Sequence, residues 1–112
     1  MMRLVLIAVF LAIEVAMIGM TTWASFDRAV WNVRGEVLAD RWFQATLLDA
    51  YLAFLTFYLW VFYKEPTILR RTVWFVLIMA LGNMAMAAYV LVQLIRWRDS
   101  EGFAALLLRR TT

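Results

Sequence analysis

The chain has no cysteine and no histidine among its 112 residues, and it contains only two serines, four glycines and one proline. Without thiols it cannot form disulfides, thiolate metal sites or iron–sulfur clusters. Without imidazole it lacks the commonest general base and the usual axial ligand of haem or chlorophyll. Both serines lie outside the apolar runs. The sequence therefore predicts a protein that is not an enzyme, with no metal or cofactor bound by its own residues.

Charged residues are also scarce, at 17% of the chain, whereas 66% of the residues are hydrophobic and the mean hydropathy is +0.79. A soluble domain of this length needs a polar shell, because most of its residues lie near water. The basic residues behind the net charge of +3 are scattered between hydrophobic runs, which gives no patch for nucleic acid. The composition predicts an integral membrane protein.

Three apolar runs are long enough to cross about 30 Å of hydrocarbon, which takes roughly 20 helical residues. They cover residues 4–24, 42–63 and 72–95. We expect helices, because an open strand would leave its backbone groups unpaired in lipid. The first run is too long for the apolar part of a signal peptide and carries Glu14 at its centre. The sequence predicts an all-α fold with three transmembrane helices in one domain, residues 1–112.

The ends of these runs carry helix-boundary signals. Asp40 can cap the second helix, and Lys64-Glu65-Pro66 ends it, because proline cannot continue a regular helix. Residues 25–40 are long enough for a short helix or a structured loop, and residues 100–112 predict a short interfacial helix with Phe103 on its apolar face. Five tryptophans near the ends of the runs are typical of an interfacial belt: Trp23, Trp42, Trp60, Trp74 and Trp97.

Lysine and arginine counts give a prediction of topology. If the three runs cross the membrane in turn, the side with the N-terminus and the loop at 63–72 carries four of them, and the opposite side carries seven. The positive-inside rule then places the N-terminus outside and the C-terminus in the cytoplasm. We expect the bacterial inner membrane, either cytoplasmic or intracytoplasmic.

Among the polar residues inside the runs, three matter most: Glu14, Asp49 and Asn83. At about 1.5 Å per residue they lie at similar depths, so they could meet as buried polar anchors. An ionised carboxylate at that depth costs a few kcal/mol unless it is paired, and a protonated one can donate to an amide or a carbonyl. Structural anchoring, proton or ion movement, and binding of a ligand or lipid headgroup are all open readings. The methionines have irregular spacing and no histidine or cysteine nearby, which favours packing over copper binding.

Helical spacing predicts which faces pack together. On the second run a stripe of small and hydroxyl residues surrounds Asp49, and the third run carries a similar stripe of Ala80, Asn83 and Ala87, so we expect these two stripes to face each other. The first run has two opposed faces. Glu14 lies on one, and the other consists of small residues: Ala8, Ala12, Ala16 and Gly19. A three-helix bundle cannot cover both, so we expect a partner, either a second copy or another subunit.

Several motifs resemble those of one family. They are W-F-Q-A-T-L-L-D-A-Y at 42–51, W-V-F-Y-K-E at 60–65 and Y-V-L-V-Q at 89–93. Over residues 41–94 the chain is similar to the plant and bacterial membrane proteins of domain of unknown function 1475; Asn83 departs from the smaller hydroxyl residue expected there. The resemblance implies that Asp49 and Tyr51 are shared features, as are Tyr63, Lys64 and Glu65 at the membrane interface, and it implies no activity.

The leading hypothesis is a non-catalytic accessory or scaffold subunit that binds a larger membrane complex of respiratory or photosynthetic type. Its aromatic flanks could contact lipid, quinone or carotenoid as well as protein. The alternative is a small oligomeric transporter or proton-linked factor that uses Glu14 and Asp49. The partners expected are membrane lipids and other membrane proteins or a second copy, with no nucleic acid.

Overall fold

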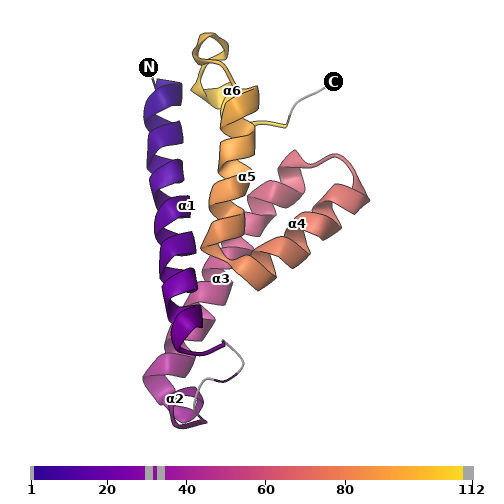
Figure 1. Ribbon diagram of the computed structural model, residues 1–112. Helices are drawn as coiled ribbons and strands as arrows, with labels where there is room; N and C mark the ends of the chain where they lie inside the picture. The colour runs from indigo at the N-terminus through magenta and orange to yellow at the C-terminus, as the bar shows by residue number, and fades with distance from the viewer. Residues whose placement is uncertain (1, 30–31, 33–34, 110–112) are drawn as a thin grey trace.

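The computed structural model describes residues 2–29, 32 and 35–109, which form helices joined by short turns and contain no strand (Figure 1). The predicted all-α class is confirmed. In chain order the elements are α1 (Met2–Asp27), α2 (Gly35–Ala39), α3 (Arg41–Lys64), α4 (Ile68–Leu81), α5 (Asn83–Arg96), the short 3₁₀ helix η2 (Asp99–Glu101) and α6 (Phe103–Leu107).

Two helices, α1 and α3, are long and apolar enough to cross a membrane. Their 26 and 24 residues correspond to about 39 Å and 36 Å at the rise of an α-helix, and they contain the predicted spans 4–24 and 42–63. Asp40 caps α3 as expected, because its side chain accepts hydrogen bonds from the backbone N–H groups of Trp42 and Phe43 at 2.9 and 3.1 Å. The helix ends at Lys64. The next residue, Glu65, has an extended conformation and precedes Pro66.

The predicted third span is broken at Gly82. The prediction of one helix over 72–95 is wrong, because Gly82 has φ +58° and ψ −123°, a conformation that residues with a side chain rarely adopt. Gly82 closes α4 through its N–H and opens α5 through its carbonyl. A Cβ atom here would also lie 2.7 Å from Cζ of Phe54. The two resulting helices have 14 residues each, so each is about 21 Å long.

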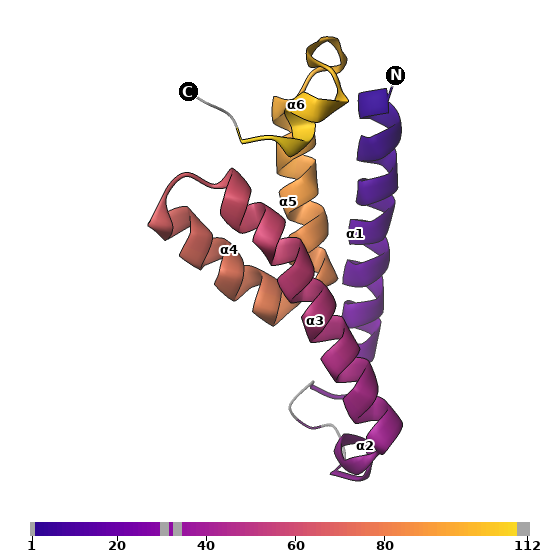
Figure 2. The same ribbon diagram turned by 180° about the vertical axis from the view of Figure 1, so that it is seen from behind.

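The break folds the chain back, so that α4 and α5 form a V with Gly82 at its tip (Figure 1). The end of α5 therefore returns to the N-terminus, where Nε of Arg3 donates to the carbonyl of Leu94 at 2.9 Å. The start of α1 and the helix α6 lie at the same end of the molecule, and α2 lies at the other (Figures 1 and 2). The continuous third helix on which the expected placement of the termini depended is therefore absent.

The main core forms where α3, α4 and α5 meet. Its buried residues are Val61, Ile78, Ala85 and Tyr89. The Tyr89 ring makes edge-to-face contacts with three aromatic rings, and the closest, Trp74, has its ring centroid 4.8 Å away. Two of the tryptophans expected in an interfacial belt, Trp60 and Trp74, are therefore packed against this core. Trp23 and Trp42 remain exposed, as a belt requires.

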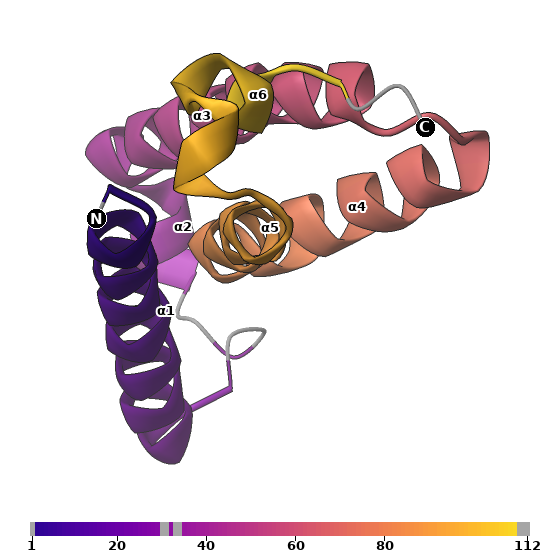
Figure 3. The same cartoon turned by 90° about the horizontal axis from the view of Figure 1, so that it is seen from above.

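A second, smaller core joins the ends of α1, α5 and α6. Leu94, Trp97 and Leu106 are buried there, and Leu6, Ile7 and Phe10 of α1 pack against them. Viewed from above, α6 bridges from the end of α5 toward α3 (Figure 3). The short C-terminal helix predicted from the sequence is thus present, but one of its apolar residues closes the end of the helix bundle.

Candidate functional site

The three predicted polar anchors do not meet. Glu14 is half-buried, whereas Asp49 and Asn83 are exposed on the surface of the chain, and within the described residues no hydrogen bond joins any two of them. Within this chain, therefore, Asp49 and Asn83 are not buried by the helices expected to cover them. Asn83 is exposed because the break at Gly82 places it at the start of α5. Asp49 is exposed because α3 turns its aromatic face, with Phe54 and Phe57, toward α4 and α5.

Glu14 faces an apolar groove of about 430 Å³ formed by α1, α4 and α5. The groove is lined by Ile18 of α1 and by six residues of α4 and α5: Trp74, Leu77, Leu81, Met84, Ala85 and Ala88. Asp49 is not among these lining residues. The two carboxylates that the transport hypothesis would combine therefore lie on different parts of the molecule.

The small-residue face of α1 remains uncovered. α1 approaches α5 through a stripe that includes Leu6, Phe10 and Glu14, and no residue of α1 is fully buried. The four small residues predicted for helix packing, Ala8, Ala12, Ala16 and Gly19, are all exposed. A Cβ atom added at Gly19 would meet nothing within 4 Å.

The two stripes expected to face each other do not. Ala45, Thr46, Asp49, Ala53 and Thr56 of α3 are exposed. On the other stripe Ala80 is exposed, whereas Ala87 is buried, with only 3% of its surface exposed. The polar stripe of α3 and the small-residue face of α1 thus form outer surfaces that this chain does not cover.

The W-V-F-Y-K-E motif at the end of α3 holds the C-terminal segment. Nε1 of Trp60 donates to the carbonyl of Leu107 at 2.9 Å, and Nζ of Lys64 donates to the carbonyl of Leu106 at 2.5 Å. In the other direction Nε of Arg109 donates to the carbonyl of Tyr63 at 2.6 Å. Tyr63 is exposed, but Lys64 and Glu65 are each only 6% exposed, so these two are more buried than an interfacial position predicts.

A small polar cavity of about 110 Å³ lies beside this motif. It is formed by the end of α3, the start of α4 and the last turns of α5. Its lining residues are Lys64, Glu65, Pro66, Arg70, Tyr89, Gln93 and Arg96. Gln93 is 5% exposed and Tyr89 is completely buried. The fold therefore brings the W-V-F-Y-K-E and Y-V-L-V-Q motifs to one cavity, although they are more than twenty residues apart in sequence.

The Tyr89 hydroxyl is buried without a hydrogen-bond partner in the described part of the chain. The charges of Glu65 and Arg96 both act on it, and the Glu65 carboxylate is also near enough to act on it as a hydrogen-bond acceptor, although the geometry falls short of a standard hydrogen bond. Most buried polar groups in proteins have a partner. Sequence reasoning gave Tyr89 and Gln93 no role, although their spacing of four residues already placed them on one helix face.

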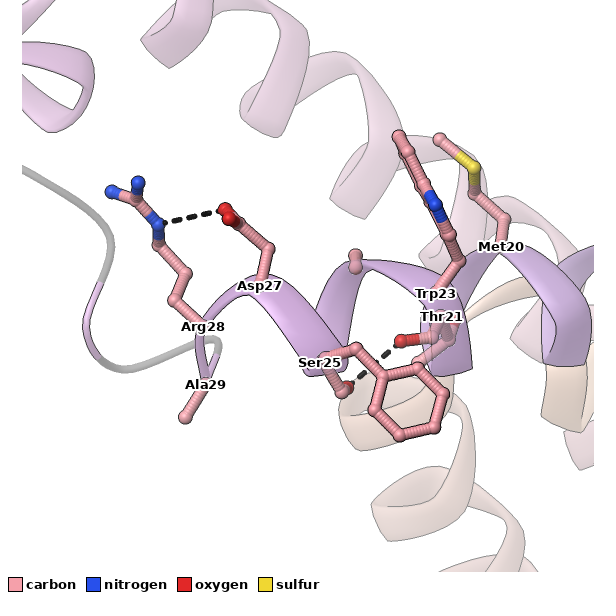
Figure 4. Close-up of a pocket in the computed structure, with 9 residues that line it drawn as sticks. Met20, Thr21, Trp23, Ser25, Asp27, Arg28 and Ala29 are labelled. Atoms are coloured by element: carbon pink, nitrogen blue, oxygen red, sulfur yellow. Dashed lines mark hydrogen bonds and ion pairs between the residues drawn. The ribbon is translucent and has the colours of Figure 1, made fainter.

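A further hollow, with a volume of about 860 Å³, lies along the last turns of α1 (Figure 4). Its lining comes from residues 20–29 alone. Its polar contacts are local: Asp27 pairs with Arg28 at 3.1 Å, and Oγ of Ser25 donates to the carbonyl of Thr21 at 2.8 Å. In the part of the chain that the structure describes, no second element adds a side chain to this hollow. Within the described residues, no three Asp or Glu side chains form a group that could hold a metal ion.

Comparison with known proteins gives one match. The family model described as "Protein of unknown function (DUF1475)" matches residues 3–109. It covers α1 and α6 as well as the region of the motifs. No curated protein and no solved structure matches the chain.

Proposed function

The chain belongs to the DUF1475 family of proteins of unknown function, and we propose that it is a small, non-catalytic integral membrane protein whose outer helix faces bind another membrane protein. α1 and α3 cross the membrane. α4 and α5, at about 21 Å each, are shorter than the hydrocarbon core of about 30 Å. They enter and leave the membrane on the same side as a helical hairpin. Irregular backbone at Gly82 is acceptable at that depth because it is packed against Phe54.

The distribution of basic residues supports an orientation with both chain ends in the cytoplasm. Of the described lysines and arginines, seven belong to the start of α1, the turn between α3 and α4 with its flanking residues, the end of α5 and the C-terminal segment, which all lie in the half of the molecule opposite α2 (Figure 1): Arg3, Lys64, Arg70, Arg71, Arg96, Arg98 and Arg109. Two, Arg28 and Arg41, lie toward the other end. The positive-inside rule counts Lys and Arg near helix ends and assigns the richer side to the cytoplasm. Location in a bacterial inner membrane stays a prediction.

Exposed Asp49 is the observation that carries the proposal of a partner. It lies two turns into α3, with small or hydroxyl neighbours on the same exposed stripe. A carboxylate inside hydrocarbon costs about 2.5–3.5 kcal/mol even on the lowest scale. Another chain that offers a hydrogen bond removes this cost, and small residues allow its backbone to approach closely. The uncovered small-residue face of α1 provides a second contact surface of the same kind.

The alternative of a proton-linked transporter has less support. Transport by Glu14 and Asp49 needs the two groups to share a path, and they lie on different faces without a hydrogen bond between them in the described part of the chain. A small accessory or scaffold subunit needs no such path. The partner is a second copy or a subunit of a larger complex, and quinone, carotenoid or lipid contacts on the aromatic flanks remain part of the proposal.

Extraction in mild detergent, followed by native sizing, tests this function. We expect the wild-type chain in a complex larger than one chain in its micelle. Asp49→Leu should release a folded single chain, because leucine suits lipid and removes the polar contact. Asp27→Leu changes an exposed acid at the end of α1 and serves as the matched control. A wild-type chain that is monomeric and has no partner would refute the proposal. Loss of pH-dependent ion flux in Asp49→Asn with assembly intact would favour transport.

A further inference from the structure

The polar cavity between α3, α4 and α5 has the features of a binding site for a small ligand. Its volume of about 110 Å³ exceeds the share of one liquid water, about 30 Å³, severalfold. It is too small for a protein segment. Three of its charged or amide side chains, Lys64, Glu65 and Gln93, are more than nine-tenths buried. A cavity with this lining holds a polar ligand, because polar groups without hydrogen bonds are costly to bury.

The unpartnered hydroxyl of Tyr89 indicates where that ligand lies. It is the one described side-chain oxygen or nitrogen that is fully buried without a hydrogen bond, and its residue lines the cavity. The Tyr89 ring is held by edge-to-face contacts with Phe57, Trp60 and Trp74. The hydroxyl is therefore fixed in place and can donate to an acceptor atom inside the cavity.

The charges around the cavity select the class of ligand. Three basic residues, Lys64, Arg70 and Arg96, line it, against one acidic residue, Glu65. Arginine recognises the oxygens of a phosphate with several N–H donors at once. The Gln93 amide adds a further donor. A phosphate group offers enough acceptor oxygens for these groups and for Tyr89.

Glu65 limits which phosphates can bind. An ionised carboxylate repels a bare anion, but it accepts a hydrogen bond from an ammonium or hydroxyl group attached to that phosphate. Ethanolamine carries such an ammonium group. Choline does not, because its nitrogen carries no hydrogen.

We propose that this cavity binds the phosphate of a phosphate ester that also carries a hydrogen-bond donor. Arg70 and Arg96 bind the phosphate oxygens from the rim, and Tyr89 and Gln93 donate to them from beneath. Glu65 accepts a hydrogen bond from the donor group of the ester. The cavity lies at the basic end of the molecule. If that end faces the cytoplasm, as the proposed function has it, a lipid headgroup supplies the phosphate. The phosphate chemistry itself does not depend on a protein partner, so a monomeric chain would leave this site intact.

Calorimetric titration of the purified full chain in detergent tests the site with three probes. They are inorganic phosphate, dihexanoylphosphatidylethanolamine and dihexanoylphosphatidylcholine. We expect the ethanolamine lipid to bind and the choline lipid to bind at least severalfold more weakly. If the ethanolamine lipid binds more tightly than inorganic phosphate, the ligand is a headgroup; if inorganic phosphate binds as tightly as the lipid, the proposed selection of a donor-bearing ester is overturned. Equal affinity for the two lipids would overturn the role of Glu65.

Two matched pairs of variants locate the binding. Tyr89→Phe should weaken binding of the ethanolamine lipid about tenfold, since it removes one hydrogen bond to a charged group. Tyr51→Phe is its control, because that hydroxyl donates to the carbonyl of Met79. Arg70→Gln should weaken binding similarly, whereas Arg41→Gln, at the start of α3 and outside the cavity, should not. No binding of any phosphate probe, or equal affinities across all four variants, would mean that the cavity holds only water.

Discussion

The α3–α5 core and helix α1 differ in how completely the chain covers them. The core surrounds Tyr89 with three aromatic rings and buries Ile78 and Val61 completely. α1 is the longest helix, yet none of its residues is fully buried, and it touches the rest of the chain along one stripe. The difference indicates that the core between α3, α4 and α5 is closed by this chain alone. α1 instead offers most of its surface to surroundings outside this chain.

The largest difference in stability between the two regions is expected when a glycine in each is replaced by alanine. Gly82→Ala should destabilise the chain by at least about 2 kcal/mol, because the backbone at Gly82 is strained for any residue with a Cβ and the added atom would meet Phe54. Gly19→Ala should be neutral, or stabilising by up to about 1 kcal/mol, because it lies in an exposed helix. Denaturant unfolding in detergent measures both. Equal effects would mean that the reversal at Gly82 is not needed.

Leucine truncation should give the next largest contrast. Leu94 is completely buried and Leu4 is 62% exposed. Leu94→Ala should cost about 2–4 kcal/mol, whereas Leu4→Ala in a detergent micelle should cost less than about 0.5 kcal/mol. The same unfolding measurement applies. A cost at Leu4 similar to that at Leu94 would show that the outer face of α1 is as tightly packed as the second core, which the inner face of α1 helps to form.

Removal of a single hydrogen-bond donor, the indole N–H of Trp60, should weaken the docking of the C-terminal segment on α3. Trp60→Phe removes the N–H that donates to Leu107 and should weaken the docking by about 1 kcal/mol. Amide hydrogen exchange in residues 103–109 should then accelerate about fivefold. Trp42→Phe, at an 83% exposed position, is the control and should leave exchange unchanged. Unchanged exchange in Trp60→Phe would mean that other contacts hold the segment.

The smallest expected effect is the change in stability when a buried tyrosine is replaced by phenylalanine, and the prediction concerns its sign. Tyr89→Phe in ligand-free protein should leave stability unchanged or raise it by about 1 kcal/mol, because the hydroxyl is buried without a partner. Tyr58→Phe should lower stability by about 1 kcal/mol, because that hydroxyl donates to the carbonyl of Arg71 at 2.9 Å. Thermal unfolding compares the two. A clear loss of stability in ligand-free Tyr89→Phe would show that the hydroxyl already has a partner.

The local features of the fold were predictable from the sequence. The apolar runs and the signals at Asp40 and Pro66 place α1 and α3 within a few residues of their observed bounds. Helix ends depend on neighbouring residues, which the sequence displays directly. The break at Gly82 was not predicted, because an isolated glycine in an apolar run is common. Its conformation is fixed by a distant residue, Phe54.

The candidate site was predictable only in part. Lys64 and Glu65 were singled out by their motif, and both line the polar cavity. Tyr89 and Gln93 reach the same cavity only because the chain reverses between α4 and α5. The expected meeting of Glu14, Asp49 and Asn83 assumed three parallel spans at equal depth, and the reversal removes that geometry.

Single-cysteine cross-linking in native membranes tests most directly whether the outer faces bind another protein, since the chain has no cysteine of its own. Ala53→Cys places a thiol on the exposed stripe of Asp49, and Ala85→Cys places one in the buried core. The thiol is labelled with a bifunctional reagent whose second group is amine-reactive or photoactivated. We predict that the label at position 53 joins the chain to a second copy or to another membrane protein. The label at position 85 should give no such product. Adducts with lipid alone at position 53 would contradict the account.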